Sequence, residues 1–233
     1  MIKKAMILAA GFGKRIQPLT LKIPKPLLQI GEETLLSNTL KFLQFSGIQK
    51  VIINTHYLSD KIKKYIKKKN FNLDINIVEE KNEILDTGGG VFNAIKYFKN
   101  EPFVIINPDT IWNKNYTNEL KIMEEFFLRK KNDKCILLVV DKKKSFDTSL
   151  KGDFNLENNL LSKKKIQLEY IYTGLQIINP KVFIGINESI FSINKIWDHL
   201  IANRSLQGIE SDINFLHVST LNIYKKLIKE FKF

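Results

Sequence analysis

The stretch AMILAAGFGKRIQPLTLKIPKPL, residues 5–27, is the part of the sequence around which the rest of the chain is organised. It opens with a short apolar run, Ala5–Ala10, which is typical of a buried strand. The run stops at Gly11-Phe12-Gly13, and glycine at the end of a strand lets the backbone turn sharply and lets a ligand approach the main chain. Lys14 and Arg15 follow at once, so the stretch predicts a strand and then a loop that binds an anion such as phosphate.

Two cations in this stretch stand in constrained positions. Arg15 is one of only three arginines in a lysine-rich chain, which indicates that its planar fork of N–H donors is needed at this place. Lys25 lies in Pro24-Lys25-Pro26, a segment that proline keeps stiff and extended. Both side chains are therefore candidates for contacts with phosphate groups.

Two better-known glycine loops are excluded. A P-loop needs G-x-x-x-x-G-K-[ST], which does not occur, and the dinucleotide fingerprint needs a third small residue where this chain has Ile16. The stretch instead resembles the double signature of the sugar-1-phosphate nucleotidylyltransferases, L-A-A-G-x-G-x-R-x-x-P-L-T and then P-K-P-L, which is matched from Leu8 to Thr20 and from Pro24 to Leu27. The resemblance continues through most of the chain and is closest to the short N-acetylmuramate-1-phosphate uridylyltransferase-like branch.

The resemblance implies a reaction and its substrates. A nucleotidyl group would pass from an NTP to a sugar 1-phosphate, giving an NDP-sugar and pyrophosphate, with Mg²⁺ as cofactor. UTP is the favoured nucleotide and GTP the next, and the implied product is of the UDP-N-acetylmuramate type in cell-wall sugar metabolism. The alternatives are a mannose-1-phosphate guanylyltransferase and a catalytically weak regulatory protein that binds nucleotide sugars.

The resemblance also implies roles for particular residues. Arg15, Lys25 and Asp109 would be catalytic, with Lys25 bridging the α-phosphate and the sugar phosphate. The residues implied for nucleotide binding are Leu8, Ala9, Ala10, Gly11, Gly13, Lys14, Arg15, Asp86, Thr87 and Gly88. Those implied for the sugar side are Asn107, Gly152, Asp153, Thr173 and Gly174, although ordinary turn chemistry explains Gly152-Asp153 and Thr173-Gly174 equally well.

Composition and charge limit the class of protein. The net charge of +13 raises the possibility of a nucleic-acid partner, but the lysines are scattered over expected helix faces, so we favour a solvated basic surface and expect no such partner. No apolar run approaches the ~20 residues that span a bilayer. The single Cys135 cannot form an internal disulfide, which suits a reducing cytoplasm. We also expect a monomer or small homo-oligomer that does not bind a membrane.

Apolar strands alternate with helical segments along the first half of the chain. This order predicts an α/β fold with a Rossmann-like, mostly parallel sheet, helices on both faces and a small sugar-side insertion. We expect one domain over residues 1–233, with a nucleotide-binding half (1–140) and a sugar-binding, closing half (141–233). The expected strands are 5–10, 50–54, 73–78, 103–107, 135–140 and 170–178, and the expected helices are 34–45, 59–69, 91–98, 118–130, 193–202 and 221–230, the second capped by Ser59 and the last by Thr220.

Asp109 has the most favourable position of any carboxylate in the sequence. It follows the apolar run Phe103–Asn107, so it should emerge at the carboxyl end of a parallel strand, where open α/β sheets bind ligands. A turn aspartate after Pro108 is the plainer interpretation. We favour a Mg²⁺ ligand, because this ion commonly uses one or two carboxylates together with phosphate oxygens and water.

The segment Asp86-Thr87-Gly88-Gly89-Gly90 allows two interpretations. Three glycines let a nucleobase lie against the backbone, whose N–H and C=O groups can read its edge. A flexible loop that leads into a helix at Val91 explains the same residues. The similar L-E-T-G-G-G segment of the family favours contacts with base and sugar.

His217 stands where the family typically has a second aspartate for magnesium. Imidazole is a poor partner for so hard a cation, so His217 is a doubtful ligand. We expect it to lie near the metal and to contact it only through water or a phosphate oxygen.

Overall fold

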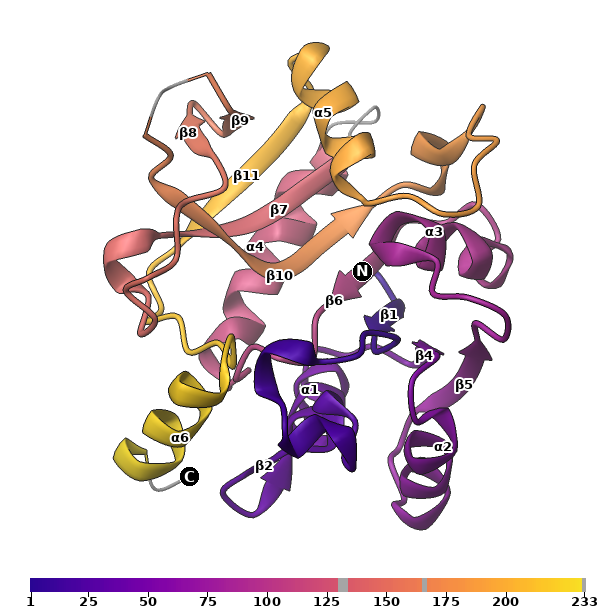
Figure 1. Cartoon of the computed structure of the whole chain (residues 1–233). Helices are drawn as coiled ribbons and strands as arrows, with labels where there is room; N and C mark the ends of the chain where they lie inside the picture. Colours follow the sequence, from indigo (N-terminus) through magenta and orange to yellow (C-terminus); the bar gives the residue numbers. More distant parts are fainter. Residues whose placement is uncertain (130–133, 165–166, 232–233) are drawn as a thin grey trace.

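A computed structural model describes residues 1–129, 134–164 and 167–231 (Figure 1). Within these ranges, nine strands form one sheet in the order β5-β4-β1-β6-β10-β7-β11-β9-β8, and Figure 1 shows it running from β5 on the right to β8 and β9 on the upper left. The strands are β1 Lys4–Leu8, β4 Lys50–Thr55, β5 Asp74–Glu79, β6 Phe103–Ile106, β7 Cys135–Asp141, β8 Asn155–Glu157, β9 Leu160–Ser162, β10 Tyr170–Ile178 and β11 Leu206–Ser211. A separate short pair is formed by β2 Gln29–Ile30 and β3 Glu33–Thr34.

The sheet is mostly parallel, as predicted. β1 pairs in parallel with both β4 and β6, β4 pairs with β5, and β11 pairs with β7. β10 runs antiparallel between β6 and β7, and the β8–β9 hairpin adds an antiparallel edge. Strands from the second half of the chain therefore extend the sheet that the first half begins.

Helices cover both faces of this sheet. They are α1 Leu35–Phe45, α2 Ser59–Lys68, α3 Asp86–Ala94, α4 Asn115–Arg129, α5 Asn194–Ala202 and α6 Leu221–Glu230. Along β1, Ala5 and Ile7 face the core under α1 and α4, whereas Met6 faces the core under α3 and α5. This alternation with a period of two explains why the strands are continuous apolar runs in the sequence.

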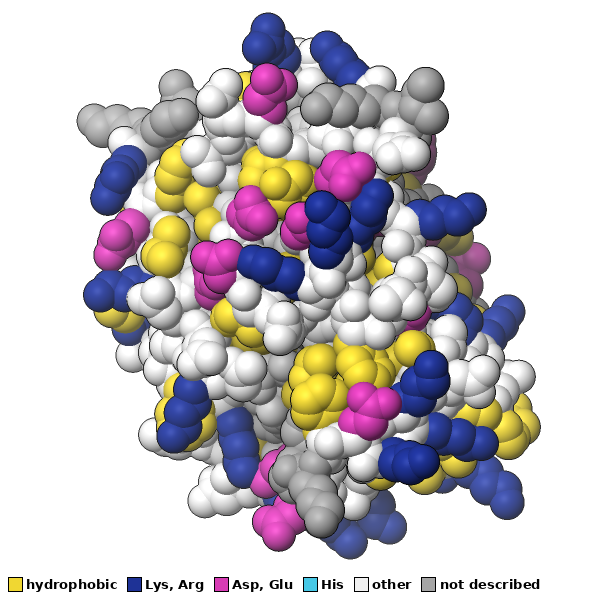
Figure 2. All heavy atoms as spheres, turned by 90° about the vertical axis from the view of Figure 1, so that its left-hand side faces the viewer, with side chains coloured by type: hydrophobic (Ala, Val, Ile, Leu, Met, Phe, Trp, Pro, Cys, Tyr) yellow, Lys and Arg dark blue, Asp and Glu magenta, His cyan; other side chains and the backbone are white. Residues whose placement is uncertain are grey.

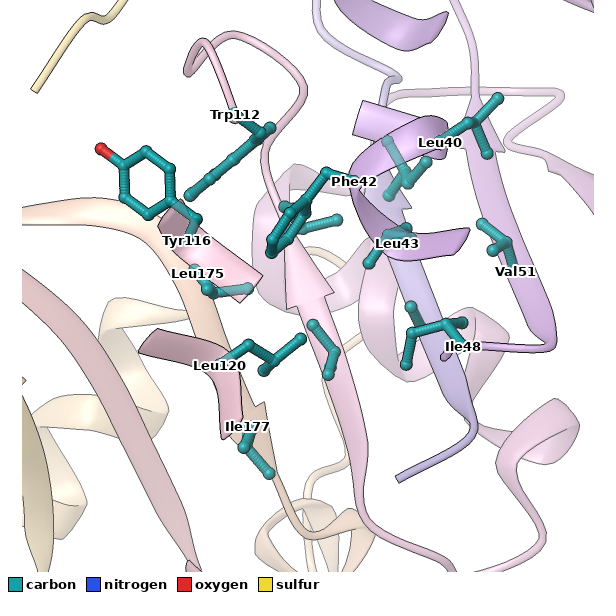
Figure 3. Packing of buried hydrophobic residues seen from close by; sticks show 14 of the residues in the cluster. Leu40, Phe42, Leu43, Ile48, Val51, Trp112, Tyr116, Leu120, Leu175 and Ile177 are labelled. Carbon is teal, nitrogen blue, oxygen red and sulfur yellow. The ribbon is translucent and has the colours of Figure 1, made fainter. Parts of the chain in front are cut away.

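The core beneath α1 and α4 is closed by aromatic side chains (Figure 3). Phe42 of α1 stacks on Trp112 with 5.4 Å between ring centroids, and Trp112 meets Tyr116 of α4 edge to face at 4.9 Å. The indole N–H of Trp112 donates to the carbonyl of Asn107 at 3.0 Å, so the buried polar atom is satisfied. This packing fixes the segment that follows β6, which carries Asp109.

Several helix boundaries differ from the predictions. The glycine segment Asp86–Gly90 is itself the first turn of α3, so the helix begins at Asp86 and not at Val91 as predicted. The prediction that Ser59 caps α2 is wrong: Leu58 precedes the helix at φ 53°, and the Ser59 hydroxyl bonds to the Thr55 hydroxyl. The cap of α6 is confirmed, since the Thr220 side chain accepts from the Ile223 amide.

The surface of the described residues agrees with the dispersed lysines of the sequence. Figure 2 shows the side of the molecule that lies on the left in Figure 1, where Lys and Arg side chains are interspersed with acidic and apolar ones. Among the described residues, no helix has both the length and the apolar character that crossing a membrane requires.

Candidate active site

A pocket of about 390 Å³ lies at the carboxyl ends of β1, β4 and β6. Most residues predicted to bind nucleotide or to catalyse line it, and one predicted sugar-side residue, Asn107, joins them. The former are Leu8, Ala9, Ala10, Gly11, Gly13, Lys14, Arg15, Lys25, Asp86, Thr87 and Asp109. Parallel strands end at one edge of the sheet, which brings together segments that are far apart in the chain. Of the predicted nucleotide-binding residues, only Gly88 is absent from the lining.

The first glycine loop is fixed at Gly13 and open at Gly11. Gly13 has φ +64°, and a Cβ there would lie 2.9 Å from the Cγ2 of Thr20. Its carbonyl accepts from the Thr20 hydroxyl at 2.8 Å and from the Ile16 amide at 2.9 Å. By contrast, a Cβ built on Gly11 would meet no described atom within 4 Å outside residues 10–12, so the backbone at this position borders open space in the pocket.

Arg15 is exposed at the pocket and takes part in none of the ion pairs of the described residues. Lys14 beside it lies 5.4 Å from the ring centroid of Phe12. The guanidinium of Arg15 is therefore available for an anionic ligand.

Lys25 and Asp109 line the pocket and meet His217, which is not part of the lining. The Lys25 Nζ donates to Asp109 Oδ2, and His217 Nε2 lies 3.2 Å from the same oxygen. His217 is brought there by short backbone pairing, in which Val218 N donates to the Asp109 carbonyl and Ile111 N to the Leu216 carbonyl, each at 2.8 Å. His217 thus lies beside the expected metal ligand, and its indirect contact with the metal stays a prediction.

The environment of Asp109 favours the ionised carboxylate. Burial raises the pKa of Asp109, but Lys25 and His217 lower that pKa by more, through charge and hydrogen bonds, so it lies well below its ordinary value. The second oxygen, Oδ1, is buried and has no hydrogen-bond partner within the described part of the chain. A buried, unpartnered carboxylate oxygen fits a hard cation such as Mg²⁺.

The protein alone supplies few further ligands for such an ion. Among the described residues, no group of three or more His, Cys, Asp and Glu side chains is arranged to hold a metal. A single carboxylate fits an ion whose remaining ligands are phosphate oxygens and water.

The second glycine segment is packed against another part of the chain. The amides of Gly88 and Gly89 both donate to the Phe191 carbonyl at 2.9 Å, and a Cβ on Gly89 would lie 2.1 Å from the Ser189 carbonyl oxygen. The Thr87 hydroxyl accepts from the Ile193 amide. Glycine is thus needed here for close packing, and the part of the segment that reaches the pocket is Asp86-Thr87.

The predicted sugar-side residues are only partly brought together. Asn107 lines the pocket, and its backbone N–H donates to the carbonyl of Gly174, whose φ is +93°. The Thr173 hydroxyl is buried and donates to the Leu138 carbonyl at 2.9 Å. Asp153 accepts from the Tyr172 amide, and Gly152 packs against the Leu168 carbonyl, so these residues have roles in the fold outside the pocket lining.

The lining also contains residues that the sequence analysis does not single out: Ile16, Pro26, Asn54, Ile84 and Pro108. Asn54 is the most informative, because its side-chain oxygen accepts from the Ala9 amide at 2.9 Å. Its only signal in the sequence is a polar residue at the end of the apolar run KVIIN.

Residues 4–146 match the family described as nucleotidyl transferase. The chain belongs to this family. It is 27% identical over 222 residues to the N-acetylmuramate alpha-1-phosphate uridylyltransferase of Caulobacter vibrioides, which covers 93% of this chain and 91% of that protein. The resemblance to the sugar-1-phosphate nucleotidylyltransferases is thereby confirmed, and the protein is an enzyme of this class.

Guanylyltransferases match shorter parts of the chain. The D-glycero-alpha-D-manno-heptose 1-phosphate guanylyltransferase of Campylobacter jejuni is 35% identical over 123 residues, which are 51% of this chain and 55% of that protein. The mannose-1-phosphate guanyltransferase beta-B of Xenopus laevis is 35% identical over 111 residues, only 31% of its length.

Solved structures show the same fold. HddC from Yersinia pseudotuberculosis superposes with a TM-score of 0.77 at 24% identity, covering 99% of this chain and all of that one. A UDP-glucose pyrophosphorylase complexed with UDP-glucose gives a TM-score of 0.79 at 18% identity, with 98% of each chain covered.

Proposed function

We propose that this enzyme transfers a uridylyl group from UTP to a sugar 1-phosphate of the N-acetylmuramate type. The observation behind the reaction is the meeting of Arg15, Lys25 and Asp109 around one pocket at the edge of the sheet. Support for the substrates comes from the Caulobacter vibrioides uridylyltransferase, the relative that matches 93% of the chain.

The chemistry needs alignment and charge neutralisation more than proton transfer. The phosphate oxygen of a sugar 1-phosphate is already anionic, so no general base is required for attack on the α-phosphorus. The open backbone at Gly11 and the exposed guanidinium of Arg15 would hold the triphosphate. Lys25 would neutralise charge on the α-phosphate and the sugar phosphate as pyrophosphate leaves.

Asp109 is the residue proposed to hold Mg²⁺, through its unpartnered Oδ1. The bound ion would supply electrostatic stabilisation for the leaving pyrophosphate. His217 contacts the opposite oxygen of Asp109 and is proposed to orient that carboxylate, with no direct bond to the metal. The low pKa of Asp109 keeps the group ionised at neutral pH, as a metal ligand must be.

GTP with a mannose- or heptose-type sugar 1-phosphate is the second candidate. It is favoured by the higher identity, 35%, of the guanylyltransferases over about half of this chain. None of the pocket residues determines the base by its chemistry alone.

A panel assay separates the candidates. Purified protein is incubated with UTP, GTP, CTP or dTTP against N-acetylmuramate, N-acetylglucosamine, glucose, mannose and heptose 1-phosphates, and pyrophosphate is measured. The proposal expects the highest kcat/KM for UTP with N-acetylmuramate 1-phosphate. A clear preference for GTP with mannose or heptose 1-phosphate would replace it by the second candidate, and nucleotide-sugar binding without turnover in any combination would indicate a regulatory protein.

A further inference from the structure

A chain of buried hydrogen bonds joins the two walls of the pocket. The Ala9 amide, in the first glycine loop, donates to Asn54 Oδ1 at 2.9 Å. Asn54 Nδ2 donates to Glu80 Oε1 at 2.7 Å, and Glu80 Oε2 accepts from the Leu85 amide at 2.9 Å. Leu85 immediately precedes Asp86 and Thr87, which line the opposite wall.

The central carboxylate is costly to bury. Glu80 is 3% exposed and Asn54 2%, and none of the ion pairs of the described residues includes Glu80. A carboxylate buried without a cation loses much hydration, and two hydrogen bonds restore only part of it. Replacing Glu80 alone by an apolar side chain would leave the Asn54 side-chain amide and the Leu85 amide without an acceptor, so this carboxylate holds the two segments together.

The surrounding chain leaves room for this pair. A Cβ on Gly90 would lie 2.6 Å from Asn54 Nδ2 and 2.8 Å from Glu80 Oε1. The third glycine of the Gly88-Gly89-Gly90 run is therefore explained by the space that the Asn54–Glu80 pair occupies, and not by contact with a ligand.

The residue that the pair supports is conformationally unusual. Asp86 has φ 60°, a conformation that side chains other than glycine adopt at a cost. Its neighbours are held on both sides, since the Leu85 amide binds Glu80 and the Gly88 amide binds the Phe191 carbonyl. The Glu80 carboxylate thus determines where the wall of residues 84–87 stands relative to the phosphate loop that begins at Ala9.

We propose that Glu80, acting through Asn54 and Leu85, is a positioning residue that sets the separation between the phosphate loop and the base-side wall and so controls the affinity for the NTP. Glu80 is absent from the pocket lining and touches no reacting atom. The inference rests on the proposed function, in that this pocket is taken as the NTP site. It holds for UTP and for GTP alike.

The polarity of the chain provides a sharp test. In Glu80→Gln the new amide N–H group must face either Asn54 Nδ2 or the Leu85 amide, both donors, so one hydrogen bond is lost. In Asn54→Asp two carboxylates face each other. The double variant combines both substitutions, so its new carboxylate accepts from the Ala9 amide and from the new side-chain amide. The oxygen of that side-chain amide accepts from the Leu85 amide, and every donor again has an acceptor.

The variants are compared by calorimetric Kd for UTP and GTP with Mg²⁺, by KM for NTP and for sugar 1-phosphate, and by melting temperature. We expect each single variant to weaken NTP binding by about tenfold or more, as the loss of a hydrogen bond to a charged group does, with little change in KM for the sugar phosphate. The double variant should recover most of the NTP affinity. The matched control is Glu79→Gln, the adjacent carboxylate, which pairs with Lys63 on the surface and should leave NTP affinity unchanged.

Several outcomes would overturn the inference. They are an unchanged NTP affinity in folded Glu80→Gln, a double variant no better than the singles, or an equal effect of Glu79→Gln. If the single variants do not fold, the double variant alone decides, because it must fold and bind NTP like the wild type. A wild-type protein that binds no NTP would refute the proposed function as well, whereas the first three outcomes would leave that function standing.

Discussion

Asp109 contacts both Lys25 and His217 through one oxygen, Oδ2, and leaves the other oxygen unpartnered among the described residues. The two oxygens therefore have different surroundings: the protein orients Oδ2, and Oδ1 is the one proposed to bind the cation. Lys25 and Asp109 could be recognised in the sequence because each follows a strong local signal, a proline-bounded segment and an apolar strand. Asn54 and Glu80 could not, because Asn54 bonds to Ala9, 45 residues away along the chain, and to Glu80, 26 residues away.

Loss of either cation that is proposed to bind phosphate should reduce turnover while the fold persists. We expect Arg15→Ala and Lys25→Ala each to lower kcat about 10²–10³-fold, as removal of one preorganised donor to a transition-state charge does. Steady-state kinetics and melting curves measure both effects. Lys22→Ala is the matched control, since Lys22 is exposed in the same loop and outside the pocket. Rates near those of the wild type in folded Arg15→Ala or Lys25→Ala would refute the proposal that these side chains contact the phosphates of the substrates.

The two residues beside the proposed metal should respond in opposite ways. Asp109→Asn should abolish Mg²⁺-dependent activity, because a neutral amide holds the ion poorly. His217→Asp should keep or raise it, since a second carboxylate would lie beside the first. Activity is titrated against Mg²⁺ for each variant. Full activity in Asp109→Asn, or a nucleotide complex with a direct bond from His217 to the metal, would contradict this assignment.

At the scale of elements, the two glycine segments have different physical roles. The loop around Gly11 is open to the pocket, whereas the turn that begins α3 is packed against residues 189–191. The sequence predicted the helix but placed its start at Val91, because the carbonyl that binds the Gly88 and Gly89 amides belongs to Phe191, about a hundred residues further on. The helix propensities of residues 86–90 carry no information about that contact.

This difference predicts contrasting effects of the same substitution. Gly89→Ala should lower the free energy of unfolding by about 1–3 kcal/mol, because its Cβ would lie 2.1 Å from the Ser189 carbonyl oxygen. Gly11→Ala should change that free energy by less than about 0.5 kcal/mol, since no described atom lies within 4 Å, yet raise KM for the NTP. Urea unfolding and kinetics distinguish the two. An unstable Gly11→Ala with normal KM would show that this loop is structural.

At the scale of the whole molecule, one sheet carries both halves of the chain. Its mostly parallel character and the helices on both faces could be predicted, because apolar strands alternate with amphipathic helices along the first half. The central position of β10 between β6 and β7 could not be predicted. An apolar strand has the same sequence pattern whether it pairs in parallel or antiparallel with its neighbours. Pairing order is set by tertiary contacts that no local pattern records.

Ligand binding should therefore stabilise the whole fold in a way that reveals how metal and nucleotide depend on each other. Mg²⁺ alone should barely change the melting temperature, because Asp109 already pairs with Lys25 and the described residues hold no group of three or more His, Cys, Asp and Glu side chains arranged for a metal. UTP with Mg²⁺ at about 100 times Kd should add ~2.7 kcal/mol of stability. Differential scanning fluorimetry measures both. A large shift with Mg²⁺ alone would indicate a metal site independent of the nucleotide.

The most direct test of nucleotidyl transfer at this pocket is the stoichiometry of its products. UTP labelled in the α-phosphate is incubated with N-acetylmuramate 1-phosphate, and the sugar nucleotide and pyrophosphate are both quantified. We predict one labelled UDP-sugar for each unlabelled pyrophosphate with the wild type, and neither product with Asp109→Asn. Formation of UDP or inorganic phosphate in place of these products, or equal yields with Asp109→Asn, would contradict the account.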